Sequence, residues 1–330
     1  MSGWAIFGNQ VLSRCTDVTS DPAALDSSGV WVVVQTFEGS LSCVRMAERR
    51  EVGDPYTGAP LWSMPARAAW SSSLDRDSYE KGVRVIRERI ASGDVYQVNL
   101  CRVLTSRMAS SPDLLALGAA LRRGNPAPYA ATIRIPEAGL FVASASPELF
   151  LRREGRTVTS SPIKGTAREP AGLTDKDRAE NVMIVDLVRN DLARTAATGS
   201  VSVPSLLKVE RHPGLVHLVS TVTAELRDGC GWAELLAAAA PPGSVSGAPK
   251  RSALRVIDQL EPVPRGVYCG AVGWVDADRA VGCLAVGIRT FSWSDGLLQL
   301  GTGAGITWGS DPAGEWEETE LKVHKLLAVS

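Results

Sequence analysis

The stretch from residue 268 to residue 302, YCGAVGWVDADRAVGCLAVGIRTFSWSDGLLQLGT, indicates the fold class most directly. Its apolar segments 268–275, 283–293 and 297–302 are rich in β-branched and aromatic residues and are predicted to be strands. A helical pattern over 313–327 then ends the sequence. A run of strands followed by a helix is typical of an α+β protein with a mainly antiparallel sheet.

The same grouping of strands and helices extends toward the N-terminus. Further strands are predicted at 31–37, 95–104, 129–135, 140–145, 149–153, 157–160, near 201 and at 216–226. Helices are predicted at 77–91, 114–123, 174–192, 232–239 and 249–260. Helices between groups of strands favour α+β over a doubly wound fold. Residues 1–75 are the least informative part, with one convincing strand at 31–37.

Composition describes an ordinary globular chain of 330 residues, with 45% hydrophobic and 22% charged residues. The net charge of -1 gives no electrostatic footprint for nucleic acid or for an anionic membrane. The start, MSGWAIFGNQ, lacks the pattern of a signal peptide, and no apolar run approaches the length of a membrane span. Six scattered cysteines without a CxxC pair are expected to be reduced, and the protein to be cytoplasmic.

Two pairs of acidic residues stand out because each is spaced by three on a predicted helix. Asp177 and Glu180 form the first pair, and Glu315 and Glu318 form the second, with Lys322 on the same face. Two such helices could meet around Mg²⁺, which prefers oxygen ligands and keeps places for substrate oxygens and water. The alternatives are two solvated helix faces, and a capping role for Asp177 in the sequence Thr174-Asp-Lys-Asp177.

Two cationic side chains have unusual sequence surroundings. Lys164 is expected in a short loop, SPIKGT (161–166), between apolar residues and Gly; a solvated surface charge is the alternative. A reactive lysine would need its pKa lowered by desolvation or by a nearby cation. Arg289 ends the apolar segment VGIRT (286–290), where it suits a substrate carboxylate or a structural salt bridge.

Together with other segments, these residues resemble one family, the chorismate-utilising enzymes, over roughly residues 75–328. The matching stretches are DVYQVNL (94–100), SPELF (146–150), PIKGT (162–166), AENVMIVDLVRND (179–191), HLVS (217–220), GSVSGAPK (243–250), YCGAVG (268–273), IRT (288–290), GAG (303–305) and residues 315–322. Many linked motifs in the same order are far more specific than any single pattern. The resemblance makes metal, arginine and lysine roles the favoured interpretations.

Residue roles follow from this resemblance by position. Glu180 and Glu318 would bind Mg²⁺ directly, and Asp177, where the family usually has Glu, and Glu315 would act through water or as further ligands. The substrate's carboxylates would be held by Tyr268, Arg289, Lys322 and the backbone amides near Gly303 and Gly305. Ser244 would line the ring, and Glu148 would be the general acid at the ring hydroxyl, with a raised pKa. His217 would lie near the ring carboxylate, with a packing role as the alternative.

Position 164 distinguishes members of this family. Anthranilate and salicylate synthases resemble one another in having PIAGT, whereas PIKGT here resembles the enzymes that form 4-amino-4-deoxychorismate. This implies that Lys164 attacks ring carbon 2, that Glu148 protonates the departing hydroxyl on carbon 4, and that ammonia then replaces Lys164. Gln97 stands where the isochorismate and salicylate enzymes have Lys, so a base that activates water is missing from that position.

The resemblance also implies a partner and an architecture. Ammonia would come from a separate glutamine amidotransferase subunit, because Asp228-Gly-Cys-Gly-Trp232 is not a glutaminase elbow. The expected anthranilate-synthase-like fold has two large, mainly antiparallel sheets packed together with helices outside. Residues 1–75 would be a shortened N-terminal segment, and residues 76–330 the chorismate-binding catalytic region, in one structural unit. The remaining alternatives are an anthranilate, isochorismate or salicylate synthase, or a chorismate-binding protein without catalysis.

Overall fold

The computed structural model describes residues 3–167, 169–212 and 215–329. Every strand pairing among these residues is antiparallel, which confirms the α+β class expected from the sequence. The strands are β1 Trp4–Phe7, β2 Gln10–Thr19, β3 Val30–Gln35, β4 Leu41–Glu51, β5 Trp70–Ser72, β6 Gln97–Arg107, β7 Tyr129–Ile135, β8 Leu140–Ser146, β9 Leu149–Glu154, β10 Thr157–Ser161, β11 Ile163–Ala167, β12 Ser202–His212, β13 Leu215–Glu225, β14 Gly247–Ala248, β15 Ala271–Asp276, β16 Val281–Val286, β17 Thr290–Ser294 and β18 Leu297–Ile306.

Six α-helices accompany the strands in the described part of the chain. They are α1 Arg76–Ala91, α2 Leu114–Gly124, α3 Asp175–Ala193, α4 Trp232–Ala239, α5 Lys250–Leu260 and α6 Pro312–Leu327. Helix α3 begins with the capping box expected from its sequence, in which Thr174 and Asp177 satisfy each other's backbone amides. All six helices lie within two residues of their predicted bounds.

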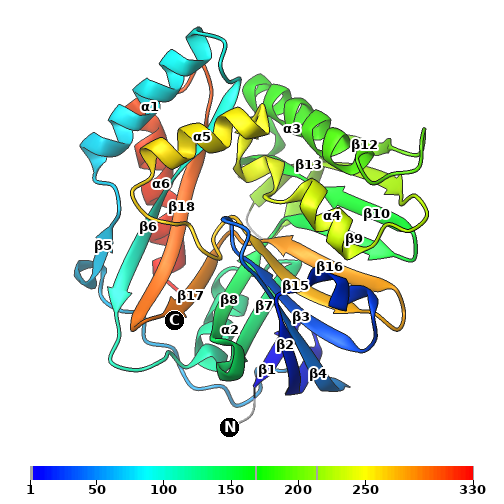
Figure 1. The fold of residues 1–330 in the computed structure, drawn as a ribbon. Coiled ribbons are helices and arrows are strands. Elements are labelled where there is room, and N and C mark those ends of the chain that lie inside the picture. The colour runs from blue at the N-terminus through cyan, green and yellow to red at the C-terminus, as the bar shows by residue number, and fades with distance from the viewer. Residues whose placement is uncertain (1–2, 168, 213–214, 330) are drawn as a thin grey trace.

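The strands form one continuous hydrogen-bonded path, which folds so that its two halves face each other (Figure 1). The first half runs β12–β13–β10–β9–β16–β15–β3–β4, with β11 also on β13. The second half runs β7–β8–β17–β18–β6, with β5 and β14 on β6, and β2 and β1 link the halves. The two large sheets expected from the sequence are thus joined through the N-terminal strands.

Apolar side chains fill both faces of the folded sheet, because many of its strands are buried on two sides. In β3, Val32 and Val34 pack between the halves with residues such as Ile133 of β7, whereas Trp31 and Val33 face the helices. Helices α3 and α4 pack against the first half, and α2 and α6 pack against the second. Helices α1 and α5 pack against β6.

Two of the places where the chain passes from one half to the other are neighbours in space. Glu148 lies between β8 of the second half and β9 of the first, and Arg289 lies between β16 and β17. The two crossings are bonded to each other, because the amide of Ala145 donates to the carbonyl of Arg289 (3.0 Å) and the amide of Val286 donates to that of Glu148 (3.0 Å). Two of the residues expected in the site therefore lie together where the halves join.

Three expectations about local structure were wrong. Residues 283–293 form two strands rather than one, because Arg289 adopts a left-handed backbone conformation (φ 51°) that ends the pairing. Lys164 lies on strand β11 rather than in a loop, since residues 163–167 pair with β13. The first 75 residues hold five strands, four of them beyond the one expected.

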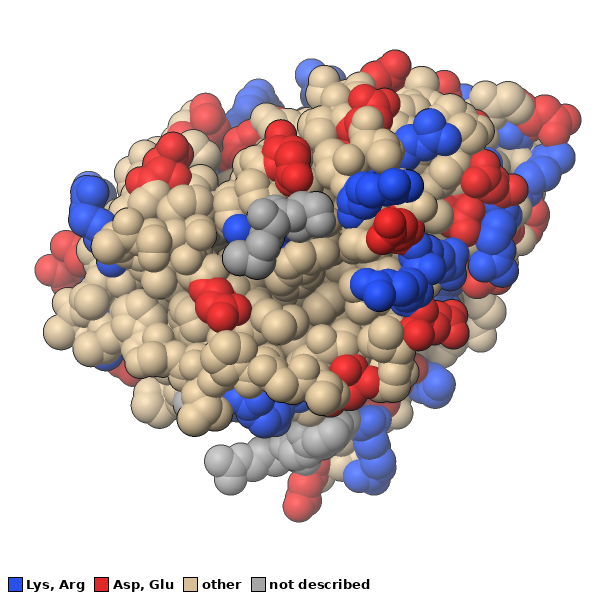
Figure 2. All heavy atoms as spheres, turned by 90° about the horizontal axis from the view of Figure 1, so that it is seen from below, with Lys and Arg blue, Asp and Glu red and all other residues tan. Residues whose placement is uncertain are grey.

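Charges on the surface are mixed in sign. On the face drawn in Figure 2, basic and acidic side chains are interspersed among larger areas that carry neither. All six cysteines are free, three of them buried and three half-buried. No helix among the described residues has the length and apolar character needed to cross a bilayer.

Candidate active site

Glu148 is a buried carboxyl group at the crossing between β8 and β9. It is 4% exposed, and burial raises its pKa from 4.5 to about 7. Hydrogen bonds from the Ser244 side chain and the Ile163 backbone, and the charge of Lys164, oppose this rise without cancelling it. A substantial fraction of the group therefore keeps its proton at neutral pH, as a general acid requires.

Lys164 reaches from β11 toward the same place. Its Nζ donates to the carbonyl of Ser244 at 3.0 Å. Burial lowers the pKa of this amine, although the carboxylates of Glu180 and Glu148 act in the opposite direction. Desolvation of this kind is the usual way in which a lysine becomes nucleophilic.

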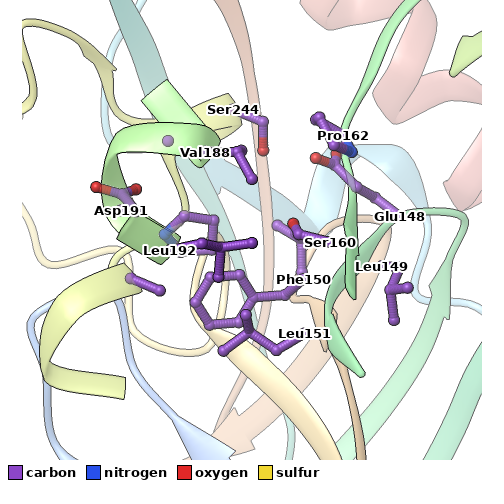
Figure 3. A pocket seen from close by; sticks show the side chains of 14 residues that line it. Glu148, Leu149, Phe150, Leu151, Ser160, Pro162, Val188, Asp191, Leu192 and Ser244 are labelled. Carbon is purple, nitrogen blue, oxygen red and sulfur yellow. The ribbon is translucent and has the colours of Figure 1, made fainter. Parts of the chain in front are cut away.

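Ser244 connects these two groups from the 3₁₀ turn Gly243–Val245. Figure 3 shows its side chain and that of Glu148 pointing toward one another at one end of a narrow cavity, with Phe150 and Leu151 along its wall. His217 of β13, which is 1% exposed, lies opposite Thr166 in the β11–β13 register. The apolar cavity wall keeps water away from the Glu148 carboxyl group.

The second half of the sheet brings Gln97 and Gly305 to this group. A methyl group at position 305 would lie 2.2 Å from Gln97 Nε2 and 3.4 Å from Lys164 Nζ, so a larger residue here would displace the Gln97 side chain. Gln97 is buried, and its Oε1 has no hydrogen-bond partner among the described residues. The unpaired Gln97 Oε1 and the neighbouring Gly305 backbone could therefore bind a polar molecule.

The residues expected to hold carboxylates lie on other elements of the structure. Lys322 of α6 donates from Nζ to the carbonyl of Gly303 at 2.8 Å. Tyr268 is buried, and burial raises its pKa well above the ordinary value, so the phenol keeps its proton. Arg289 donates to Asn125 Oδ1 at 3.5 Å and forms no ion pair among the described residues. Its guanidinium is thus free of a competing protein carboxylate in that part of the chain.

The four acidic residues come from α3 and α6, but their carboxylates are partly engaged. Asp177 Oδ2 accepts both the amide and the hydroxyl of Thr174 at 2.8 Å, so the expected cap is present. Glu318 pairs with Lys322 at 2.7 Å. Lys176 Nζ lies 3.7 Å from Glu180 Oε1 and 3.4 Å from Glu315 Oε1. Lysine ammonium groups therefore neutralise the carboxylates in this arrangement.

These donors fit Mg²⁺ by their chemistry. Burial raises the pKa of Glu180, the charges of Lys164 and Lys176 lower it, and the Glu315 and Asp177 carboxylates raise it, so several charged groups lie close to this carboxylate. Within the described ranges no three acidic, His or Cys side chains converge as a metal site does. Mg²⁺ needs only one or two protein carboxylates, because water and substrate oxygens complete its shell.

Sequence reasoning assigned no role to several residues that position the site. Lys250 pairs with the buried carboxylate of Asp191 at 2.7 Å and donates to the carbonyl of Ala239 at 2.8 Å. Arg265, also buried, donates to the carbonyls of Val245 (2.8 Å) and Asn99 (2.7 Å). Both cations hold the backbone on either side of Ser244, and for Lys250 its place in the motif GSVSGAPK was the available signal.

A second, wider hollow of about 600 Å³ lies elsewhere, between the β3–β4 turn and helices α4 and α5. Phe37, Leu236 and Pro241 are among its lining residues, and none of the residues predicted from the sequence is. The chemistry-bearing groups therefore gather where the halves join rather than in the larger hollow.

Comparison with known proteins agrees with this arrangement. The chain is 40% identical over 272 residues to aminodeoxychorismate synthase component 1 of Klebsiella aerogenes, covering 79% of this chain and 59% of that protein. It is 39% identical over 299 residues to anthranilate synthase component 1 of Streptomyces coelicolor, covering 86% of this chain and 58% of that protein. The chain thus spans somewhat more than half the length of these relatives.

The fold matches a solved structure over nearly its whole length. The menaquinone-specific isochorismate synthase of Escherichia coli superposes with a TM-score of 0.82 at 21% identity, covering 99% of this chain and 88% of that one. Residues 26–328 match the family described as chorismate binding enzyme. On the strength of that match and of the relatives near 40% identity, the chain belongs to the chorismate binding enzyme family.

Proposed function

We propose that this chain replaces the hydroxyl on carbon 4 of chorismate with an amino group, giving 4-amino-4-deoxychorismate for 4-aminobenzoate and folate synthesis. The observation that carries the proposal is the placement of Lys164. Its desolvated amine lies beside a carboxyl group, Glu148, whose pKa of about 7 lets it hold a proton at neutral pH. A nucleophile and a proton donor side by side suit substitution of a poor leaving group.

The reaction would proceed in two balanced steps. The lone pair of the Lys164 amine forms a bond to ring carbon 2, electrons move through the ring double bonds, and the hydroxyl on carbon 4 leaves as water with the proton of Glu148. Ammonia then forms a bond to carbon 4, the electrons return, and the Lys164 amine departs. The net change is loss of water and gain of ammonia.

Other residues would bind and orient the substrate. Lys322, Arg289 and Tyr268 would hold its carboxylates, and Ser244 and Gln97 would contact the ring and its polar substituents. His217 would lie near the ring carboxylate. Mg²⁺ held by Glu180 and Glu318, with Asp177 and Glu315 nearby, would supply positive charge for the ring carboxylate. This tight positioning is what the buried side chains of the two sheet halves contribute.

Ammonia would come from a glutamine amidotransferase partner. Two relatives near 40% identity are named component 1, which supports a separate second component. Cys230, the cysteine between two glycines, is half-buried in the turn before α4 and lacks the glycine that a glutaminase elbow needs at position 228. The chain alone would therefore use free ammonia.

Anthranilate synthesis is the second candidate, because one relative at 39% identity carries that name. It would place the amino group on carbon 2, the carbon that Lys164 is proposed to block. Lysine at position 164 therefore argues against it, and the identity of the product decides between the two.

The decisive experiment traps the proposed covalent intermediate. Protein is mixed with chorismate and Mg²⁺ without ammonia, quenched, digested and analysed by mass spectrometry. The peptide containing Lys164 should gain the mass of chorismate less one water. Lys164→Ala should lose most 4-amino-4-deoxychorismate formation, and Lys164→Arg should also fail because guanidinium stays protonated and is a poor nucleophile.

Lys208→Arg is the matched control, because Lys208 is an exposed lysine on β12 that pairs with Glu210. It should keep full activity. An unmodified Lys164 peptide together with an active Lys164→Arg variant would sink the nucleophile assignment, and formation of anthranilate by the unaltered chain would favour the second candidate.

A further inference from the structure

Lys176 forms a charged bridge between two helices that belong to opposite halves of the sheet. It lies in the first turn of α3, which packs on β13, and it reaches Glu315 of α6, which packs on β18. Its side chain is 48% exposed, whereas those of Glu180 and Glu315 are 14% and 7% exposed. A half-exposed ammonium group thus neutralises two carboxylates that are mostly withdrawn from water.

Without these two carboxylate partners, a positive charge at position 176 would be unfavourable. A cation in the first turn of a helix meets the positive end of the helix dipole. The Lys176 ammonium group nevertheless lies 3.4 Å from Glu315 Oε1 and 3.7 Å from Glu180 Oε1. The attraction of the two carboxylates therefore determines where the ammonium group rests.

The other lysines of this region are held differently. Lys322 pairs with Glu318 and donates to Gly303, and Lys164 donates to the carbonyl of Ser244. Within the described part of the chain, Lys176 is the lysine whose Nζ lies within 4.0 Å of both Glu180 and Glu315. Without it, the two mostly buried carboxylates would lose the ion-pair partner that they share.

We propose that Lys176 is an internal counter-ion that occupies the place of the divalent cation between α3 and α6 until that cation binds. The inference rests on the proposed function, since it takes Glu180 and its neighbours as the oxygen donors for Mg²⁺. A divalent cation bound to Glu180 would repel an ammonium group held a few ångströms away. The long, half-exposed side chain then turns into solvent, so Lys176 weakens metal binding by competing for the same carboxylates.

A purely structural bridge makes the opposite prediction. If Lys176 only joined α3 to α6, its removal would loosen the two helices and leave metal affinity unchanged or weaker. Under competition, removal frees Glu180 and Glu315 for the metal and tightens binding. Metal affinity in the absence of substrate therefore separates the two roles.

The test measures Mn²⁺ binding to the full chain without chorismate, from the electron paramagnetic resonance signal of the free ion. Mn²⁺ favours the same carboxylate and water ligands as Mg²⁺. Lys176→Met should lower the Kd for Mn²⁺ about tenfold, whereas Lys176→Arg should stay near the parent value because the charge remains. Lys208→Met, which removes an exposed lysine that pairs with Glu210, is the matched control and should change Kd less than twofold.

Each remaining outcome is informative. Equal or weaker binding by Lys176→Met, with binding abolished by Glu318→Gln, would overturn the counter-ion role and leave the metal site of the proposed function standing. Absence of Mn²⁺ binding in every variant would overturn both the metal assignment and this inference, while the product formed from chorismate would still test the amination itself.

Discussion

At the scale of single residues, the site depends on two groups whose ordinary charges are disfavoured by burial. The pKa of Glu148 is raised to about 7 and that of Lys164 is lowered, so each moves toward the protonation state that the proposed chemistry needs. Both effects have the same physical cause, because an ionised group loses its hydration when it is buried. Burial of these two side chains therefore lowers the free energy of unfolding.

Glu148 gives a pH prediction that is independent of catalysis. Between the unfolded pKa of 4.5 and the folded pKa of about 7, the native state holds a proton that the unfolded state has released. The free energy of unfolding should therefore fall as pH rises through this window, by up to about 3 kcal/mol. Glu148→Gln removes this contribution, so its stability relative to the parent protein should improve from pH 5 to pH 8 in urea unfolding.

The control is Glu88→Gln, an exposed carboxylate of α1, which should leave the pH dependence unchanged. If the difference in unfolding free energy between Glu148→Gln and the parent stayed constant from pH 5 to pH 8, the raised pKa would be wrong.

At the scale of elements, regular periodicity made the helices predictable, whereas much of the N-terminal sheet was not. Strand β2 has one fully buried position, Leu12, and its sequence lacks the apolar alternation of a half-buried strand. Lys164 appeared to lie in a loop because Pro162 and Gly165 interrupt the pattern, yet its segment pairs with β13 through a register shift. Pairing with a distant strand overrode the local signal in both cases.

The residues of the site also fall into those that the sequence predicted and those that it did not. Glu148, Lys164, Ser244 and Gln97 were identified from motifs, and the structure brings them together. The contacts made by Lys176, Lys250 and Arg265 were not predicted from the sequence. An ion pair or hydrogen bond between distant segments leaves no periodic pattern in a single sequence.

Helices α3, α4 and α5 are joined at one point by Lys250. Its ammonium group satisfies the buried carboxylate of Asp191 at the end of α3 and the carbonyl of Ala239 at the end of α4. Lys250→Met should therefore cost about 3–5 kcal/mol in the free energy of unfolding, because it leaves a buried charge unpaired. Urea unfolding followed by circular dichroism measures this loss.

Arg189→Met is the matched control on α3, the helix that carries Asp191, since Arg189 and its partner Asp186 are both exposed. It should cost less than about 1 kcal/mol. Equal losses for the two variants would mean that the buried pair contributes no more than a surface pair.

At the scale of the whole molecule, the reacting groups come from both halves of one folded sheet. Lys164 and Glu180 belong to the first half, and Gln97, Gly305 and Glu318 belong to the second. Strand β1 joins β2 to β7 and so completes the link between them. The N-terminal segment therefore helps to hold the two sets of residues at a fixed separation.

Which nitrogen source the purified chain can use tests the proposal for the whole molecule. The purified 330-residue chain should form the aminated product from chorismate, Mg²⁺ and an ammonium salt, but not from glutamine. Cys230→Ser should change neither result, because this half-buried thiol is not expected to act on glutamine. Product formation with glutamine as the sole nitrogen source, measured by chromatography, would contradict the assignment of a separate amidotransferase.

The bonded crossings at Glu148 and Arg289 have a consequence for how ligand binding and folding are linked. The contacts that assemble the site join residues far apart in sequence, such as Lys164 with Ser244 and Ser146 with Val286, so they exist only once both halves have folded and met. A ligand of this site should therefore bind only the native state, and neither an unfolded nor a half-folded chain. Its binding energy should therefore be added to the cooperative unfolding of the entire molecule, and saturating ligand should slow proteolysis at distant loops as well as near the site.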